Sequence, residues 1–150
     1  MPFTVIAPSA GPAPMGMDKS GNQLVPADTA NLKLADWVAR TGYGNTTIVN
    51  HELVSGGDAT VMVQCSVKLT AAWSSQWGVL RAAVMRNDTE VLKTADFVNS
   101  TSTLTLSGTQ VSLLAGDRLW VRMTNTTSGP FSSSATVTSG ATTYLSFDLI

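Results

Sequence analysis

The sequence predicts an all-β domain, and three observations support that prediction. Several short segments alternate apolar and polar residues, as half-buried strands do. Turn-forming sequences separate these segments at intervals of about 8–12 residues. No segment of three turns or more places its apolar residues on one face of a helix. Many short strands with regularly spaced turns are typical of a sandwich or a barrel.

The N-terminal region, Met1–Pro26, differs in composition from the rest of the chain. It is rich in Pro, Gly and Ala and has no sustained period, which predicts extended, irregular chain. A disordered tail and an arm that orders on a neighbouring molecule both remain open. We favour the arm because its apolar side chains are costly to expose. We therefore expect an arm over residues 1–29 and a domain over residues 30–150. The candidate arm anchors are Phe3, Val5, Ile6, Met15 and Met17.

The segments that follow have strand patterns of different kinds. Residues 31–40 (NLKLADWVAR) alternate at first and then shift phase before Trp37, which predicts a bulge or a bend. Residues 77–87 form a more continuous apolar run, as expected of a strand covered on both sides. Residues 118–125 (RLWVRMTN) and 142–150 (TTYLSFDLI) alternate. So do residues 59–69, whose apolar face comprises Val61, Val63, Cys65, Val67 and Leu69.

An Asp-Arg pair interrupts the apolar pattern in SLLAGDRLWVRMTN, residues 112–125. We interpret this stretch as a strand, a tight turn and a second strand. Gly116 supplies the backbone freedom of the turn, and the carboxylate of Asp117 can accept hydrogen bonds from exposed amides there. Arg118 would begin the next strand on the face away from Leu119. A simpler interpretation, in which the two charges only solvate the turn, is also open.

The order of these segments resembles the C1q/TNF-like jelly roll. The resemblance rests on GDATVMVQCSV, GVLRAAVMRNDTEV, LLAGDRLWVRM and the terminal TTYLSFDLI, and it covers about residues 30–150. It implies an antiparallel jelly-roll sandwich that assembles as a homotrimer. The sequence lacks a collagen repeat and the acidic loop cluster that binds calcium in some members, so no calcium site is carried over.

The low charge, the VMRNDTEV hairpin and the Ser/Thr-rich loops are similar to those of jelly rolls on bacteriophage virion proteins. The opening MPFTVIAPSAG resembles the start of actinobacteriophage minor tail and small head proteins. The resemblance implies a structural virion protein, made in the cytoplasm of the host bacterium. A minor tail protein anchored by the N-terminal arm is the first expectation, and a capsid decoration protein is the alternative. Its partners would be further copies of itself and other tail or capsid proteins.

Composition excludes several other classes of function. The net charge is −1, so no electrostatic footprint for nucleic acid is present. No apolar run reaches the roughly 18 residues of a membrane span, so we expect no membrane insertion. The single cysteine, Cys65, excludes an intramolecular disulfide, and we expect it to be a small buried side chain.

Catalytic chemistry is not evident in the sequence. The only histidine, His51, is next to Glu52, and adjacent strand residues point to opposite faces. We therefore expect a non-enzymatic protein without metal or cofactor.

Two tryptophans leave a different class of function open. Trp73 and Trp77 (AAWSSQWG) could stack on sugars, which would make the chain a host carbohydrate- or receptor-binding module. Equally, one of the two tryptophans could belong to the core and the other to the interface of an oligomer.

Overall fold

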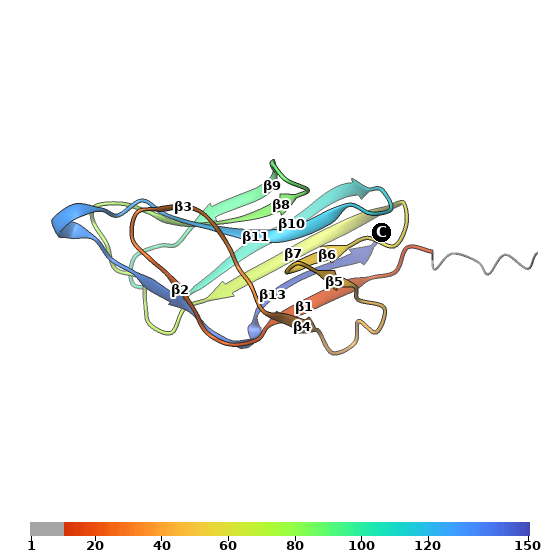
Figure 1. Cartoon of the computed structure of the whole chain (residues 1–150), viewed down its shortest axis with the longest axis horizontal. Helices are drawn as coiled ribbons and strands as arrows, with labels where there is room; N and C mark the ends of the chain where they lie inside the picture. The colour runs from red at the N-terminus through yellow and green to blue at the C-terminus, as the bar shows by residue number, and fades with distance from the viewer. Residues whose placement is uncertain (1–10) are drawn as a thin grey trace, which may run out of the picture.

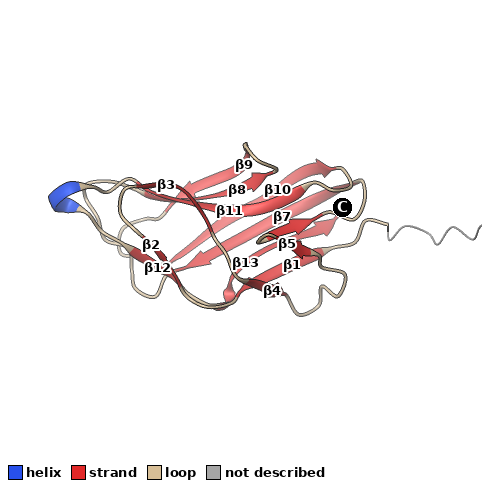
Figure 2. Cartoon of the chain, viewed as in Figure 1, coloured by secondary structure: helices blue, strands red, loops and turns tan. Residues whose placement is uncertain are grey.

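Two large antiparallel sheets packed face to face form most of the described part of the protein. We describe a computed structural model, which defines residues 11–150. Figures 1 and 2 show the long strands running along one axis of the molecule. The five-stranded sheet comprises, from edge to edge, β10 (Thr103–Leu113), β7 (Ala59–Lys68), β13 (Gly140–Leu149), β1 (Met15–Lys19) and β4 (Trp37–Ala39). The predicted all-β sandwich is confirmed.

The six-stranded sheet covers the inner face of the first sheet. Its strands, in order, are β5 (Ile48–Val49), β6 (Glu52–Val54), β11 (Arg118–Asn125), β8 (Leu80–Arg86) and β9 (Glu90–Asp96), and β3 (Thr29–Lys33) also pairs with β11. The connection between β10 and β11 passes from one sheet to the other, so the stretch around Gly116 closes one end of the sandwich.

The two ends of the sandwich differ. At one end lie a two-stranded sheet of β2 (Gln23–Val25) and β12 (Ala135–Val137) and a single 3₁₀ turn, η1 (Gly129–Phe131). Figure 1 shows η1 at the tip of that end, while the C-terminus and the start of the described chain lie at the other. Among residues 11–150 no helix is long and apolar enough to cross a membrane.

The core lies between the two large sheets and contains the residues that alternation predicted. Val61, Val63, Cys65 and Val67 of β7 are at most 2% exposed, and they face Leu119 and the other inward residues of β11. Burial raises the pKa of the Cys65 thiol to about 12, which keeps the thiol neutral at physiological pH. Cys65 is therefore an apolar core residue.

The continuous apolar run of β8 is covered on both faces. Ala82 and Val84 belong to the main core, whereas Ala83 and Met85 pack with Trp120 in a second cluster on the outer side of the sheet. Strands buried on both faces lose the alternation of half-buried strands. The phase shift before Trp37 marks a bend: the chain leaves β3 in one sheet, passes Asp36 at a φ of +59°, and enters β4 in the other.

The N-terminal region, for which the sequence predicted irregular chain, contains two strands, β1 and the short β2. Residues 15–19 form β1, which pairs with both β13 and β4. Met15 and Met17, expected as arm anchors, are 3% and 0% exposed in the core. The arm expected over residues 1–29 therefore does not extend past the start of β1. The short MGMDK segment alternates and contains no proline, but the prolines and glycines around it dominate the regional composition.

Candidate functional site

The turn at Gly116 and Asp117 joins the two large sheets. Gly116 has a φ of +87°, a conformation that glycine adopts without steric cost. The backbone N–H of Leu114 donates a 3.0 Å hydrogen bond to Oδ2 of Asp117, and Nδ2 of Asn87 donates one of 3.1 Å to its Oδ1. Asp117 thus caps the turn and ties it to the loop between β8 and β9. The turn has a structural role.

Replacing Gly116 by valine is expected to destabilise the protein by about 1 kcal/mol or more, because a β-branched residue is penalised at positive φ. For a chain of this length the melting temperature should fall by about 2–4 °C or more. Thermal unfolding followed by circular dichroism measures this shift. The matched control is Gly44→Val: Gly44 is also free of close neighbours but does not have a positive φ. Equal melting temperatures for the two variants would contradict the prediction.

The two tryptophans of AAWSSQWG have different environments. Trp73 is 3% exposed and belongs to the main core. Trp77 is 62% exposed and stacks on Phe131, with ring centroids 4.6 Å apart and planes 27° from parallel. Of the two sequence candidates, Trp77 is the one whose side chain projects into water. Phe131, which is 52% exposed, was not among the candidates because it lies 54 positions further along the chain in an uncharged loop.

A buried polar network fixes the loop that carries Phe131. Asn125 and Thr127 are at most 1% exposed, and both donate to the backbone carbonyl of Ser133, over 2.6 and 2.9 Å. The N–H of Ser133 donates in return to Oγ1 of Thr127, over 3.0 Å. Gly78 packs so closely on Thr127 that an added Cβ would lie 2.8 Å from its backbone nitrogen. The loop carrying Trp77 is therefore held against the loop carrying Phe131.

An open groove of about 390 Å³ lies between the same two loops. Leu69, Trp73 and Ala135 contribute buried apolar surface to it. The remaining lining residues are small, and most carry a hydroxyl: Thr70, Ala71, Ala72, Ser74, Ser133, Ser134 and Thr136. We call the groove together with Trp77 and Phe131 the loop-end site.

The outer side of the five-stranded sheet is a second candidate surface. On β7 and β10 the residues that point away from the core carry no charge, apart from Lys68 at the end of β7. We call this surface the uncharged face. It comprises Thr60, Met62, Gln64, Ser66, Thr103, Thr105, Gln110 and Ser112.

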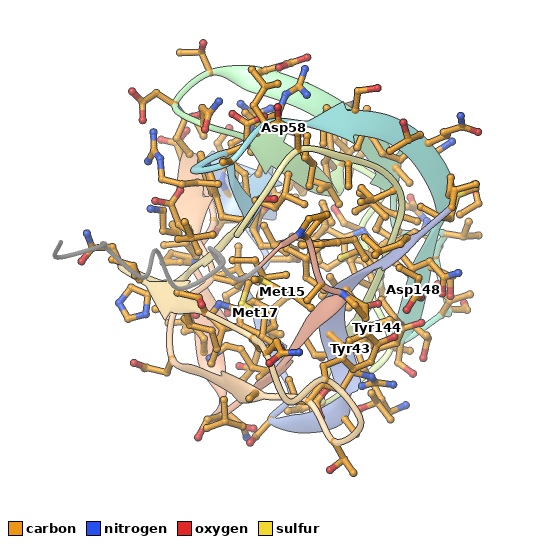
Figure 3. All side chains as sticks on the ribbon, turned by 90° about the vertical axis from the view of Figure 1, so that its right-hand side faces the viewer. Met15, Met17, Tyr43, Asp58, Tyr144 and Asp148 are labelled. Atoms are coloured by element: carbon orange, nitrogen blue, oxygen red, sulfur yellow. The ribbon has the colours of Figure 1, made fainter. Side chains whose placement is uncertain are left out.

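Aromatic and charged side chains border the uncharged face on the side of β13 and β1. Arg40 lies 4.1 Å from the ring centre of Tyr144 and forms an ion pair with Asp18. The hydroxyl of Tyr43 donates a 3.4 Å hydrogen bond to Asp148, and Figure 3 shows these two side chains on the same side of the molecule as Tyr144. Partial burial, and then the charge of Asp148, raise the pKa of the Tyr43 phenol.

Charges concentrate on the opposite sheet. Six of the nine lysines and arginines lie in its strands: Lys33, Arg81, Arg86, Lys93, Arg118 and Arg122. Exposed ion pairs contribute little stability but keep a surface well solvated. The six-stranded sheet is therefore the charged side of the sandwich, in contrast to the uncharged face.

Glu52 is the buried carboxylate of this charged sheet. Its side chain is 4% exposed, accepts a 2.9 Å hydrogen bond from Nη1 of Arg118 and lies 3.6 Å from Nζ of Lys33. Arg118 also donates to Asp88 and holds the pKa of that carboxyl below its usual value. His51 is not in a strand as expected: it occupies a turn with a φ of +66°. Among residues 11–150 no three His, Cys, Asp or Glu side chains gather as a metal site.

Three of the sequence candidates, Phe3, Val5 and Ile6, lie outside the described residues. The described chain begins next to the loop after β6, where Gly57 packs against Pro12 so closely that an added Cβ would lie 2.7 Å from the proline nitrogen. This end is opposite the loop-end site (Figure 1). A molecule attached through its N-terminal residues would present Trp77 and Phe131 at its far end.

No protein-family sequence model matches the chain, and no curated protein matches it by sequence. Solved structures do share its fold. Eiger TNF from S. frugiperda is 13% identical, with a TM-score of 0.62 over 93% of this chain and 92% of that chain. Murine APRIL is also 13% identical, with a TM-score of 0.58 over 93% of this chain and 99% of that chain. The chain therefore has the TNF-like jelly-roll fold that the sequence resemblance implied.

Proposed function

We propose that this protein is a non-enzymatic structural component of the virion of a tailed bacteriophage, a trimeric minor tail protein attached through its N-terminal residues. The phage assignment rests on the resemblance of the low-charge jelly roll and of MPFTVIAPSAG to virion proteins. A capsid decoration protein would use the same plan, and it remains the alternative within this class.

One observation carries the trimeric part of the proposal: the uncharged face over β7 and β10 differs in charge from the six-stranded sheet. Desolvating a charge costs several kilocalories per mole, so charged residues are depleted from the centre of protein interfaces. On β7 and β10 the uncharged face has no charged side chain apart from Lys68, at the end of β7. The six-stranded sheet, in contrast, holds six of the nine lysines and arginines. We propose that the uncharged face packs against neighbouring copies around a threefold axis. In a closed ring of three copies joined head to tail, each copy buries this face against its neighbour, so that none of the three faces is left in water.

The attachment to the particle is assigned to Phe3, Val5 and Ile6, the candidate anchors that precede the described chain. Burying such side chains in a neighbouring virion protein stabilises a complex by about 1.5–3 kcal/mol each, before the cost of ordering. Attachment through this end leaves the rest of the jelly roll free to project.

Immunogold labelling of intact phage particles tests the proposal. Antibody against this chain is expected to decorate the tail, and mass spectrometry should find the chain in purified particles. Labelling of the capsid shell would favour the decoration protein. If the chain is made during infection but is absent from purified particles, the proposal is wrong. The matched variant is the triple substitution of Phe3, Val5 and Ile6 by serine, which should abolish incorporation without changing the circular dichroism spectrum.

A further inference from the structure

The loop-end site combines features of a ligand-binding surface that the trimeric scaffold does not require. Of the four tryptophans, Trp37, Trp73 and Trp120 are at most 9% exposed, and only Trp77 is in water. Exposing two stacked aromatic rings is costly, so an exposed aromatic patch of this kind marks an interaction site. Val98, 68% exposed in a neighbouring loop whose Asn99 Oδ1 accepts from the N–H of Ser75, is a further apolar residue nearby.

Specific contacts hold the two loops that carry the rings of Trp77 and Phe131. The buried Asn125–Thr127–Ser133 network holds one loop, and the close contact of Gly78 with Thr127 holds the other. The N–H of Val79 also donates a 2.8 Å hydrogen bond to Oγ1 of Thr126. Little conformational entropy is lost when a ligand binds here, because the two loops are already ordered in the free protein.

The groove, which is lined by residues 69–74 and 133–136 from the same two loop regions as the rings, offers neutral hydrogen-bonding groups. Neither residues 70–79 nor residues 126–136 include a charged side chain. The hydrogen bonds that Thr70, Ser133 and Thr136 form within the described chain run through backbone atoms or, for Ser133, from its backbone to Thr127. Their hydroxyls are therefore left for water or for a ligand. Each hydroxyl can both donate and accept.

These features select one class of ligand. A nucleic acid or an anionic polymer would need cations, which both loops lack. An apolar protein surface would cover the hydroxyls without giving them partners, at a cost for each group. A neutral saccharide has an apolar C–H face that fits an aromatic ring and an edge of hydroxyls that fits serines and threonines. We infer that the loop-end site binds a neutral saccharide, with Trp77 and Phe131 as the stacking platform and the groove as the polar subsite.

This inference does not depend on attachment to a virion, because it concerns the isolated protein in solution. The probe is a panel of short neutral oligosaccharides built from glucose, galactose, mannose or arabinose, titrated into the full chain by calorimetry. We expect at least one of them to bind and to protect Trp77 from quenching by iodide. Quenching reports on this site because the other three tryptophans are buried.

Variants locate the site. Trp77→Ala and Phe131→Ala are each expected to weaken binding about tenfold or more, through loss of a stacking surface. Trp77→Phe should retain most of the affinity because it keeps an aromatic face. Leu114→Ala, at the opposite end and 61% exposed, should bind like the wild type. Binding by none of the panel, equal binding by the Trp77→Ala/Phe131→Ala double variant, or binding only of charged glycans or of a protein would each overturn the inference.

Discussion

Deleting residues 1–19 is expected to prevent folding, although the composition of this region is that of a dispensable tail. The deletion removes β1, whose backbone is hydrogen-bonded to β13 on one side and β4 on the other. It also removes Met15 and Met17 from the core. Replacing a buried methionine by alanine costs about 2–5 kcal/mol, and a whole domain is stable by about 5–15 kcal/mol. Loss of both side chains, at about 4–10 kcal/mol together, is comparable with the stability of the whole domain, and loss of the hydrogen bonds of β1 adds to it.

Circular dichroism and thermal unfolding measure the effect. The truncated chain should lack a cooperative transition, and the single variant Met17→Ala should unfold at a clearly lower temperature than the wild type. The matched control is deletion of residues 1–10, which removes no described strand and should leave a cooperative transition. A cooperative transition at the wild-type temperature after deletion of residues 1–19 would show that β1 is dispensable to the sandwich.

The sequence predicted the fold class and most of the long strands because a half-buried strand is a local pattern. In β7 the alternation from Val61 to Leu69 needs no knowledge of the partner strands, and the turn at Gly116 requires only a positive φ that glycine permits. The family resemblance then supplied the arrangement of the strands. The solved TNF-like structures agree with it.

Strand β1 was missed for a physical reason. It has five residues, and its two apolar side chains give too short an alternation to be distinguished from irregular chain. What makes it a strand is the pair of partners, β13 and β4, that only the tertiary structure brings to its sides. The regional excess of proline and glycine pointed the other way.

The loop-end site was predictable only in part. The sequence identified Trp77 as a candidate. It could not show that Trp77 is exposed while Trp73, four positions earlier, is buried. Both lie in a loop, where no period separates inward from outward residues. Phe131 becomes relevant only because the buried side chains of Asn125 and Thr127 hold its loop against the first one. Such a contact between distant loops has no local signature.

The uncharged face gives the second large expected effect. In light scattering at micromolar concentration the wild-type chain should have three times the 15.7 kDa mass of one chain. Gln64 lies near the middle of this face, on β7 between β10 and β13. The variant Gln64→Glu keeps the shape of the side chain and adds one charge. An uncompensated charge buried in an interface destabilises that interface by about 3–5 kcal/mol. Because all contacts in the ring are identical, every interface of the trimer is destabilised by this amount.

Gln64→Glu is therefore expected to run as a monomer, with a circular dichroism spectrum that shows a folded sandwich. Gln64→Lys should do the same, because the cost comes from burying a charge of either sign and not from one particular neighbour. The matched control is Asn31→Asp, which adds the same charge at an exposed position of β3 on the six-stranded sheet and should stay trimeric. Because the six-stranded sheet already holds six of the nine lysines and arginines, and Asn31 is exposed on it, one more charge there disturbs no contact of the uncharged face. If both Gln64 variants keep the mass of the wild type, the uncharged face is not the interface, and if the wild type itself is monomeric, the chain does not form the proposed trimer.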